Sequence, residues 1–516
     1  MNSYDVIVVG AGHNGLIAAA YLAKAGKRVI ALERRSILGG ACVTEEIPGA
    51  PGYRVSTGAA QLGNLRPEIV ADLDLAAHGY ELILPDPMSV FPTGDGRALT
   101  IWLDRERTLA EVRAFSAADA EALPRFQQDC GAFCDILEPM LYRPEAPSMA
   151  AVEAAFRAAG REDLFQGFVL GSIRDLLAER FESDVVRAFL GLTATFGTNG
   201  GPDTPGTAYV MAHHLFGATT GVRGQAGYVR GGMGGLADAL AAAARAAGAT
   251  LRTDAEVARI LTRRGAVAGV ELAGGERVEA PVVLSNADPK LTYLKLLAPG
   301  AAPSETLAAA RAIETTGQAL KLNLALRRLP KFAAAPAGAV PARVTISPSQ
   351  DYVAAAWADA AAGGMSRAPF MTVHMQSAID PSLAPAGGHT LTVYAHYFPY
   401  ELRDRPGGWD DAARAEAAEL LLATIERHAP DIRETIVAME VMAPPDIEAR
   451  FAMTGGHQFQ GDMLAPNLFD ARPAPGAANA PAVAGLFLCG AGAHPGGCIW
   501  GAPGQRAAAL ALEALG

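Results

Sequence analysis

Three glycines and one acidic residue near the N-terminus have the types and spacing of a dinucleotide-binding turn. In YDVIVVGAGHNGLIAAAYLAKAGKRVIALERR, Gly10, Gly12 and Gly15 follow an apolar run, and Glu33 closes a second one. Gly10 permits a tight turn, Gly12 lets the backbone approach a pyrophosphate, and Gly15 allows close helix packing. The flanking runs supply the context that this motif requires, so the segment predicts a dinucleotide site.

The helix that follows the turn and the acid Glu33 add two further expectations. A helix N-terminus offers unpaired N–H groups and a partial positive charge to phosphates. Glu33 can accept hydrogen bonds from both hydroxyls of a ribose and would repel a 2′-phosphate. An NADP-type adenosine is therefore disfavoured.

The C-terminal segment GLFLCGAGAHPGGCIWGAPGQRAAALALEAL favours FAD over NAD. Its apolar run delivers Gly490 and Gly492 to a glycine-rich loop, and a helix begins near Pro503. The N-terminus of that helix, placed at the N1 and O2 edge of a flavin, would stabilise the reduced ring. The alternative is a glycine loop that ends an ordinary strand and helix unit.

Flavin-dependent dehydrogenation needs a proton acceptor beside the hydride acceptor, and four side chains qualify. Lys321 lies in ALKLNLALRRL, where strand alternation places Lys321 and Asn323 on one face and leucines on the other. His494 lies in the C-terminal loop, and the pair His213 and His214 is a weaker candidate. The alternatives are an ion-paired strand lysine, a structural loop histidine and hydrogen-bonded core histidines.

Three other side chains have weaker claims. Trp500 would wall a site beside the C-terminal loop, although one aromatic residue does not make the paired cage that an amine favours. Arg223 and Arg230 border a glycine-rich passage and would bind an acidic substrate group.

These residues depend on a predicted α/β architecture. We expect a strand from Tyr4 to Val9, a helix ending near Gly26, a strand ending in Ser285 and the C-terminal strand and helix to form one unit. Apolar residues at three- and four-residue spacing predict helices over residues 104–196. Alternating runs such as LKLNLALRRL and LTVYAHYF predict a second, sheet-based unit.

Composition excludes several classes of protein. The chain has 516 residues, a net charge of −11 and no basic run interleaved with aromatics, so a nucleic-acid partner is not expected. Five irregularly spaced cysteines indicate neither a disulfide framework nor a metal site. No run predicts a membrane-spanning helix, so we expect a cytoplasmic protein and leave peripheral contact with a membrane open.

Several stretches together resemble the phytoene-desaturase-like flavoproteins, in the wider class that includes monoamine oxidases. The chain is most similar to their branch named pyridine nucleotide-disulfide oxidoreductase domain-containing proteins. The matching stretches run along the whole chain: GAGHNGLIAAAYLAKAG, ERRSILGGACVTEEIPG, LRPEIVADLDLAAHG, YVRGGMGGLADAL, VVLSNADP, GGHQFQGDM and LFLCGAGAHPGGCIWGAPGQRAA.

This resemblance implies a three-part architecture: a glutathione-reductase-like FAD-binding domain, a mixed-sheet substrate domain and a helical insertion. The FAD-binding domain takes residues 1–75, 225–290 and 465–516. The substrate domain takes residues 76–103, 205–224 and 291–464, and the insertion takes residues 104–204.

The resemblance also assigns cofactor contacts residue by residue. The predicted FAD-binding residues are Gly10, Gly12, His13, Asn14, Gly15, Glu33, Arg34, Gly39, Gly40, Gly58, Val257, Gly490, Gly492, Gly501 and Ala502. Many relatives have an aspartate after the final strand, where this chain has Ala491, so the ribityl chain needs another polar contact. Monoamine-oxidase-like enzymes place a lysine at the position that matches Lys321, where it holds a water at flavin N5.

The name of the branch suggests disulfide chemistry, but the residues do not supply it. Disulfide reductases have two cysteines separated by four residues after the second glycine pair. Cys42 occupies the first place and Ile47 the second, so no redox-active disulfide can form here.

The sequence therefore predicts an FAD-dependent oxidoreductase of the desaturase or dehydrogenase type, with Lys321 and His494 as candidate catalytic residues. We expect hydride transfer between flavin N5 and a hydrophobic substrate such as a polyene or isoprenoid. An amine or amino-acid oxidase and a non-catalytic flavin-binding partner protein are the alternatives. The sequence leaves the electron acceptor open.

Overall fold

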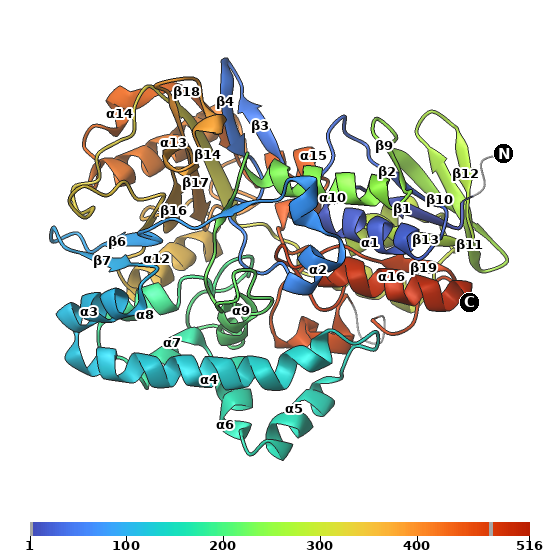
Figure 1. Cartoon of the computed structure of the whole chain (residues 1–516), viewed down its shortest axis with the longest axis horizontal. Coiled ribbons are helices and arrows are strands. Elements are labelled where there is room, and N and C mark those ends of the chain that lie inside the picture. Colours follow the sequence, from blue (N-terminus) through green and yellow to red (C-terminus); the bar gives the residue numbers. More distant parts are fainter. Residues whose placement is uncertain (1–3, 474–477) are drawn as a thin grey trace.

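A five-stranded parallel sheet forms one half of the molecule (Figure 1). This computed structural model describes residues 4–473 and 478–516; residues 1–3 and 474–477 of the predicted FAD-binding domain lie outside the described residues. The strand order is β19 (Leu486–Leu488), β13 (Val282–Ser285), β1 (Val6–Val9), β2 (Val29–Leu32) and β9 (Thr250–Arg252).

Both faces of this sheet are covered, as its uninterrupted apolar strands require. Val6 and Val8 face a layer of three helices, α1 (His13–Lys24), α10 (Met233–Ala246) and α16 (Ala502–Leu515). Ile7 and Val9 face the meander β10 (Val257–Arg263), β11 (Ala266–Leu272) and β12 (Arg277–Glu279). The alanine-rich faces of α1 and α16 let these two helices lie side by side (Figure 1).

A seven-stranded mixed sheet forms the other half (Figure 1). Its order is β18 (Ile436–Met442), β14 (Ala319–Leu326), β17 (His389–His396), β16 (Met371–His374), β15 (Arg343–Ile346), β6 (Ser89–Pro92) and β7 (Ala98–Ile101). Leucines of β14 face α13 (Asp411–Glu426) in an apolar core. The opposite face of this sheet is polar and buried, and it faces the rest of the molecule.

Helices from one stretch of chain cover the remaining side of the molecule (Figure 1). They are α3 (Arg105–Phe115), α4 (Ala117–Leu141), α5 (Met149–Ala158), α6 (Glu162–Leu164), α7 (Ile173–Ala178) and α8 (Asp184–Leu190), followed by α9 (Thr207–His213). Phenylalanines stack between them, with ring centroids of Phe133 and Phe168 4.9 Å apart. No helix in the described part of the chain is long and apolar enough to cross a membrane.

Two short ladders and the remaining helices complete the chain. The ladders pair β3 (Thr44–Ile47) with β4 (Ala50–Ser56), and β5 (Leu82–Ile83) with β8 (Tyr228–Val229). The remaining helices are α2 (Pro67–Asp72), α11 (Ser304–Ala312), α12 (Gln350–Ala361), α14 (Ile432–Thr435) and α15 (Pro444–Phe451). The predicted domain boundaries stay a prediction.

Candidate active site

The glycine turn between β1 and α1 is shaped for a close ligand. A Cβ on Gly12 would come within 2.6 Å of the side-chain Nδ2 of Asn286, so a larger residue here would have to displace that side chain. Gly12 caps α1 without a side-chain hydrogen bond, and the first turn of α1 has no acid. The buried His13 Nε2 and Asn14 Oδ1 have no hydrogen-bond partner among the described residues. The positively polarised N-terminus of α1 therefore has unpaired hydrogen-bonding groups that a phosphate could contact.

Glu33 is buried at the end of β2 with its carboxylate held by backbone. Oε2 accepts from the Ala11 amide at 2.9 Å, and Oε1 accepts from the Arg35 amide at 3.0 Å. A carboxylate offers about four acceptor sites. The remaining sites of Glu33 fit the hydroxyls of a ribose.

The second glycine pair lies against the first turn. Gly12 and Gly39 form a parallel bridge, and a Cβ on Gly40 would meet the Gly12 Cα at 3.0 Å. Gly58 packs just as closely on the backbone of Ala41. These segments bring the chain after Glu33 back over the N-terminus of α1, where the pyrophosphate and flavin-side phosphate are expected.

Three polar residues that the residue-level prediction missed lie at the glycine turn and the C-terminal loop. Asn286 covers the glycine turn, and the Gln460 carbonyl accepts from the Gly492 amide at 2.9 Å. Arg472 is 2% exposed and donates to the Ala491 carbonyl at 2.9 Å. Asn286 and Gln460 lie in the stretches VVLSNADP and GGHQFQGDM, which resemble the family, so these two motifs could have indicated both residues.

The other predicted cofactor residues take varied positions. Arg34 donates to the carbonyls of Ala449 and Arg450, at the end of α15. Val257 begins β10, and the Ala255 amide two residues earlier donates to the Glu33 carbonyl at 2.8 Å. Gly501 caps α16 with φ +80° and Ala502 begins the helix. The set fits FAD, and each individual contact stays a prediction.

The polar face of the seven-stranded sheet combines two rows of cross-strand neighbours. One row contains Met442, Lys321, Tyr394 and Thr372, and the next contains Glu440, Asn323, Thr392, His374 and Arg343. Directly opposite residues point to the same side of a sheet, so both rows face the same space. The predicted alternation of Lys321 and Asn323 against the leucines is confirmed.

Lys321 is buried beneath the segment that joins β4 to Gly58. Its Nζ donates to the Ser56 carbonyl at 2.8 Å and to the Gly58 carbonyl at 2.5 Å, with 2% of the residue exposed. Burial lowers the pKa of the amine to about 7, while the Glu440 carboxylate opposes that shift. A neutral amine that donates two N–H groups keeps a lone pair for a proton or a water.

Beside Lys321, four rings form a cluster that we call the aromatic box: Phe196, Phe370, Tyr394 and His396. The His396 ring packs against both Phe196 and Phe370, with centroids 4.3 and 4.4 Å away, and those two rings also pack on each other, with centroids 5.9 Å apart. Tyr394 meets it edge-on at 4.6 Å.

The aromatic box is uncharged. Burial lowers the pKa of His396 to about 3 and raises that of Tyr394, so both are neutral near pH 7. The Tyr394 hydroxyl and His396 Nε2 have no hydrogen-bond partner among the described residues. Tyr394 lies close enough to Cys498, in the C-terminal loop, for the charged forms of the two side chains to repel each other. The box therefore adjoins the predicted flavin loop.

The other candidate histidines lie elsewhere. His494 is buried near the backbone of Leu141 and Phe469, its pKa is lowered by burial to about 3, and no hydrogen bond joins it to Lys321. His213 fits the alternative of a hydrogen-bonded core histidine, because its Nε2 lies 2.9 Å from the Gly497 carbonyl. His214 Nδ1 lies 2.7 Å from the Val210 carbonyl. A catalytic role for His494 stays a prediction.

The expectations for two arginines and a tryptophan need correction. Arg223 forms ion pairs with Asp135 and Glu138, and Arg230 with Glu81, so neither is reserved for a substrate. Trp500 is fully buried and stacks on Phe216 of the helical region at 5.5 Å. These side chains already have partners within the fold. The spacing of residues along the sequence does not reveal those partners.

All five cysteines are free, including Cys42 beside the second glycine pair. Its Sγ lies 3.5 Å from His13 Nδ1, and burial raises the pKa of the thiol to about 12. Ile47, in the place of a second cysteine, is buried apolar core. The site therefore contains no dithiol. Among the described residues no cluster of His, Cys, Asp and Glu could hold a metal ion.

Comparison with known proteins gives matches along nearly the whole chain. Residues 15–511 match the family model described as flavin containing amine oxidoreductase. Pyridine nucleotide-disulfide oxidoreductase domain-containing protein 2 of Mus musculus is 35% identical, with 99% of this chain and 94% of that protein covered. A limonene dehydrogenase polypeptide of Castellaniella defragrans is 28% identical, with 99% and 95% covered. Hydroxyneurosporene desaturase of Rhodobacter capsulatus is 29% identical, with 55% and 56% covered.

Solved structures show the same fold at low sequence identity. Putrescine oxidase bound to putrescine superposes with a TM-score of 0.61 at 17% identity, covering 99% of both chains. The fold is thus the amine-oxidase-like α/β fold with mixed sheets, and the family resemblance predicted from the sequence is confirmed.

Proposed function

Because this chain belongs to the flavin containing amine oxidoreductase family, we propose that it is a dehydrogenase or desaturase of a hydrophobic, isoprenoid-like substrate. It is an FAD-dependent oxidoreductase, and FAD supplies a hydride acceptor when bound. The observation that carries the substrate class is the uncharged aromatic box on the same sheet face as Lys321.

In this proposal the glycine turn, Glu33 and the C-terminal loop hold the cofactor. We assign the five-stranded sheet with its meander to the glutathione-reductase-like class. We also propose that the chain has the three-domain division given above. The strand order and the helix layer on one face support that assignment.

The chain's own residues handle the proton and exclude water. Desaturation removes a hydride and a proton from adjacent substrate carbons to form a C=C bond; bound FAD would supply the hydride acceptor, and the chain's own residues would take the proton. Lys321, neutral above its lowered pKa, accepts that proton directly or through a water held at its free position. The buried, uncharged rings of the aromatic box would keep bulk water away from Lys321, and we place the planar, π-rich substrate chain beside them.

An amine substrate is the second candidate, because the family model and putrescine oxidase both point to it. An ammonium group would gain from aromatic faces. The box, however, contains no carboxylate, and Glu440 on the same sheet face is already paired with Arg450 at 2.6 Å. The names limonene dehydrogenase and hydroxyneurosporene desaturase support an apolar substrate.

An anaerobic titration of the FAD-loaded protein tests the proposal. Limonene and a carotenoid precursor are compared with putrescine and cyclohexylamine, and loss of the oxidised flavin absorbance is recorded. We expect the isoprenoids to reduce the flavin and the amines to leave it oxidised. Faster reduction by amines would replace this proposal with the amine-oxidase function, and no reduction by either class would favour a non-catalytic role.

A further inference from the structure

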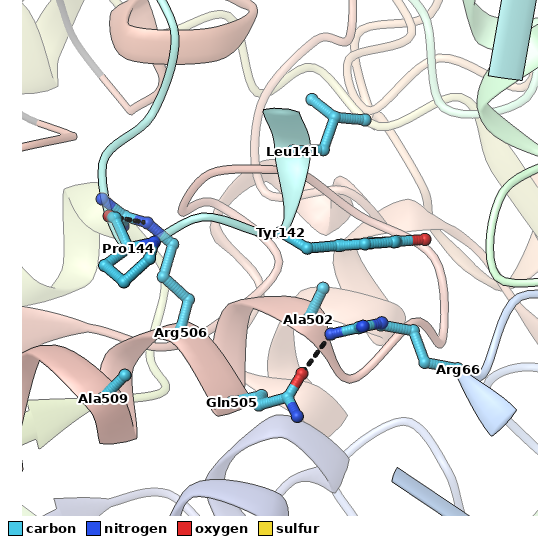
Figure 2. A pocket seen from close by; sticks show the side chains of 8 residues that line it. All are labelled: Arg66, Leu141, Tyr142, Pro144, Ala502, Gln505, Arg506 and Ala509. Atoms are coloured by element: carbon cyan, nitrogen blue, oxygen red, sulfur yellow. Dashed lines mark hydrogen bonds between the residues drawn. The ribbon is translucent and has the colours of Figure 1, made fainter. Parts of the chain in front are cut away.

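A cavity of about 250 Å³ lies between α16 and the segment that leaves α4 (Figure 2). Its lining residues are Arg66, Leu141, Tyr142, Pro144, Ala502, Gln505, Arg506 and Ala509. The four α16 residues recur at helical spacing and so share one face of that helix. Only Ala502 is also a predicted FAD contact, and none of the residues belongs to the aromatic box or to the polar sheet face.

Arg506 brings a positive charge to this cavity. The residue is 8% exposed and donates to the Pro144 carbonyl at 2.8 Å, the Ala478 carbonyl at 2.7 Å and Asn479 Oδ1 at 3.2 Å. These acceptors are neutral, and no described carboxylate pairs with it. A buried guanidinium without a counter-charge is costly, which a bound anion would relieve.

Arg66 brings a second positive charge. Its Cζ lies 3.7 Å from the centroid of the Tyr142 ring, and Nη1 donates to Gln505 Oε1. Nε is buried without a hydrogen bond, and the Glu68 carboxylate, 3.5 Å away, is largely exposed to solvent. Solvent weakens that ion pair. In Figure 2 the side chains of Arg66 and Arg506 approach the cavity from two different sides.

We propose that this cavity binds a small organic anion with one carboxylate or phosphate group. Guanidinium groups are the donors that both kinds of anion prefer, and Nη1 of Arg506 and Nη2 of Arg66 donate no hydrogen bond to the described residues. Leu141 and the methyl groups of Ala502 and Ala509 would contact a short apolar tail. The volume is below the range of drug-sized ligand sites, so the ligand is small.

Binding of the anion would affect the C-terminal loop that is predicted to meet the flavin. The Trp500 indole N–H donates to the Tyr142 hydroxyl at 3.3 Å, and the Arg66 amide donates to the Trp500 carbonyl at 3.4 Å. Trp500 directly precedes Gly501, the N-cap of α16. A ligand that fixes Arg66 and Tyr142 therefore acts on the loop predicted to meet the flavin.

Calorimetric titration of the FAD-loaded protein tests this site. Butanoate and inorganic phosphate are added separately at constant ionic strength, with butylammonium as the charge-reversed probe. We expect saturable binding of at least one anion, and the two titrations tell carboxylate from phosphate recognition. No saturable heat from either anion, or equal binding of butylammonium, would overturn the proposal.

Variants assign the binding to this cavity. Arg66→Gln is expected to weaken binding about tenfold or more, because it removes a charge-assisted hydrogen-bond donor to the anion. Ala509→Leu, which fills the cavity without changing its charge, is expected to block binding as well. Arg113→Gln, on the exposed side of α3, serves as the matched control. Unchanged affinity in both cavity variants, with the fold intact by circular dichroism, would place the anion elsewhere.

Discussion

Lys321 is the residue on which the proposed chemistry depends most. Its two carbonyl partners are neutral, so nothing in direct contact compensates the charge of an ammonium group. We expect Lys321→Met to slow flavin reduction by about 10²- to 10⁴-fold, the usual contribution of a general base. Rapid-mixing absorbance under anaerobic conditions measures this rate.

The pH profile separates this role from a structural one. Because the amine must be neutral to accept a proton, reduction by wild-type protein is expected to rise with pH through about 7. Lys331→Met, at an exposed position, should keep that profile. A Lys321→Met protein that reacts at the wild-type rate with the same profile would exclude the role.

Stability has a pH dependence of its own at Lys321. Below about pH 7 the amine is protonated in both folded and unfolded chains, and burial of its charge destabilises the fold. Between about 7 and the ordinary value of 10.5, only the unfolded chain stays protonated, so the folded state is progressively favoured as pH rises. Urea unfolding should show wild type gaining stability relative to Lys321→Met across this window. A constant difference would mean that the folded-state pKa is not lowered.

Glu33 carries the prediction for cofactor affinity. Replacing it with alanine removes the acceptors that we assign to the ribose and leaves the Ala11 and Arg35 amides without their partner. We expect the Kd for FAD to rise about 10- to 100-fold, since hydrogen bonds to a charged group contribute roughly 1.5–3 kcal/mol. Fluorescence titration measures this, with the exposed Glu279→Ala as control. Equal affinity in the two variants would remove Glu33 from the site.

At the scale of elements, local patterns in the sequence predict more than long-range contacts do. The alternation around Lys321 correctly gives the two faces of β14, and the glycine spacing correctly gives the turn before α1. The aromatic box escaped prediction because Phe196 lies between α8 and α9 whereas Tyr394 lies on β17. The spacing of Tyr394 and His396 indicates that they share one face of a strand. The sequence does not show that Phe196 packs against them, because only tertiary folding brings that ring to the strand.

The packing of α1 on α16 makes a prediction at the same scale. A Cβ on Gly504 would meet the backbone of Asn14 at 2.9 Å or closer, so the two helices touch through glycine. Gly504→Val is expected to destabilise the protein by about 1–3 kcal/mol, as overpacking typically does, and to weaken FAD binding. Thermal unfolding and FAD titration measure both effects. Ala514→Val, at the exposed end of α16, should change neither; equal effects of the two would contradict the close contact.

At the scale of the whole molecule, hydrogen bonds join the two sheets across the proposed site. Lys321 donates to the carbonyl of Gly58, Arg343 donates to Gln61 at 2.8 Å, and Gln376 donates to the Val229 carbonyl at 2.7 Å. Lys321 and Arg343 belong to the seven-stranded sheet and Gln376 follows its strand β16, whereas Gly58 and Gln61 follow β4 and Val229 lies in β8. The sheets are therefore expected to unfold together.

Cofactor binding should stabilise both halves as one unit. A ligand that binds only the folded state adds about 4 kcal/mol at a free concentration of roughly 1,000 Kd. If these hydrogen bonds hold the sheets together, excess FAD should raise the urea midpoint of unfolding. The increase should be the same when unfolding is followed by tryptophan fluorescence and by hydrogen exchange in β14. Lys321→Met removes one link and should reduce this agreement without abolishing FAD binding. Two separate transitions, with β14 insensitive to FAD, would show that the sheet bearing Lys321 folds independently of the cofactor.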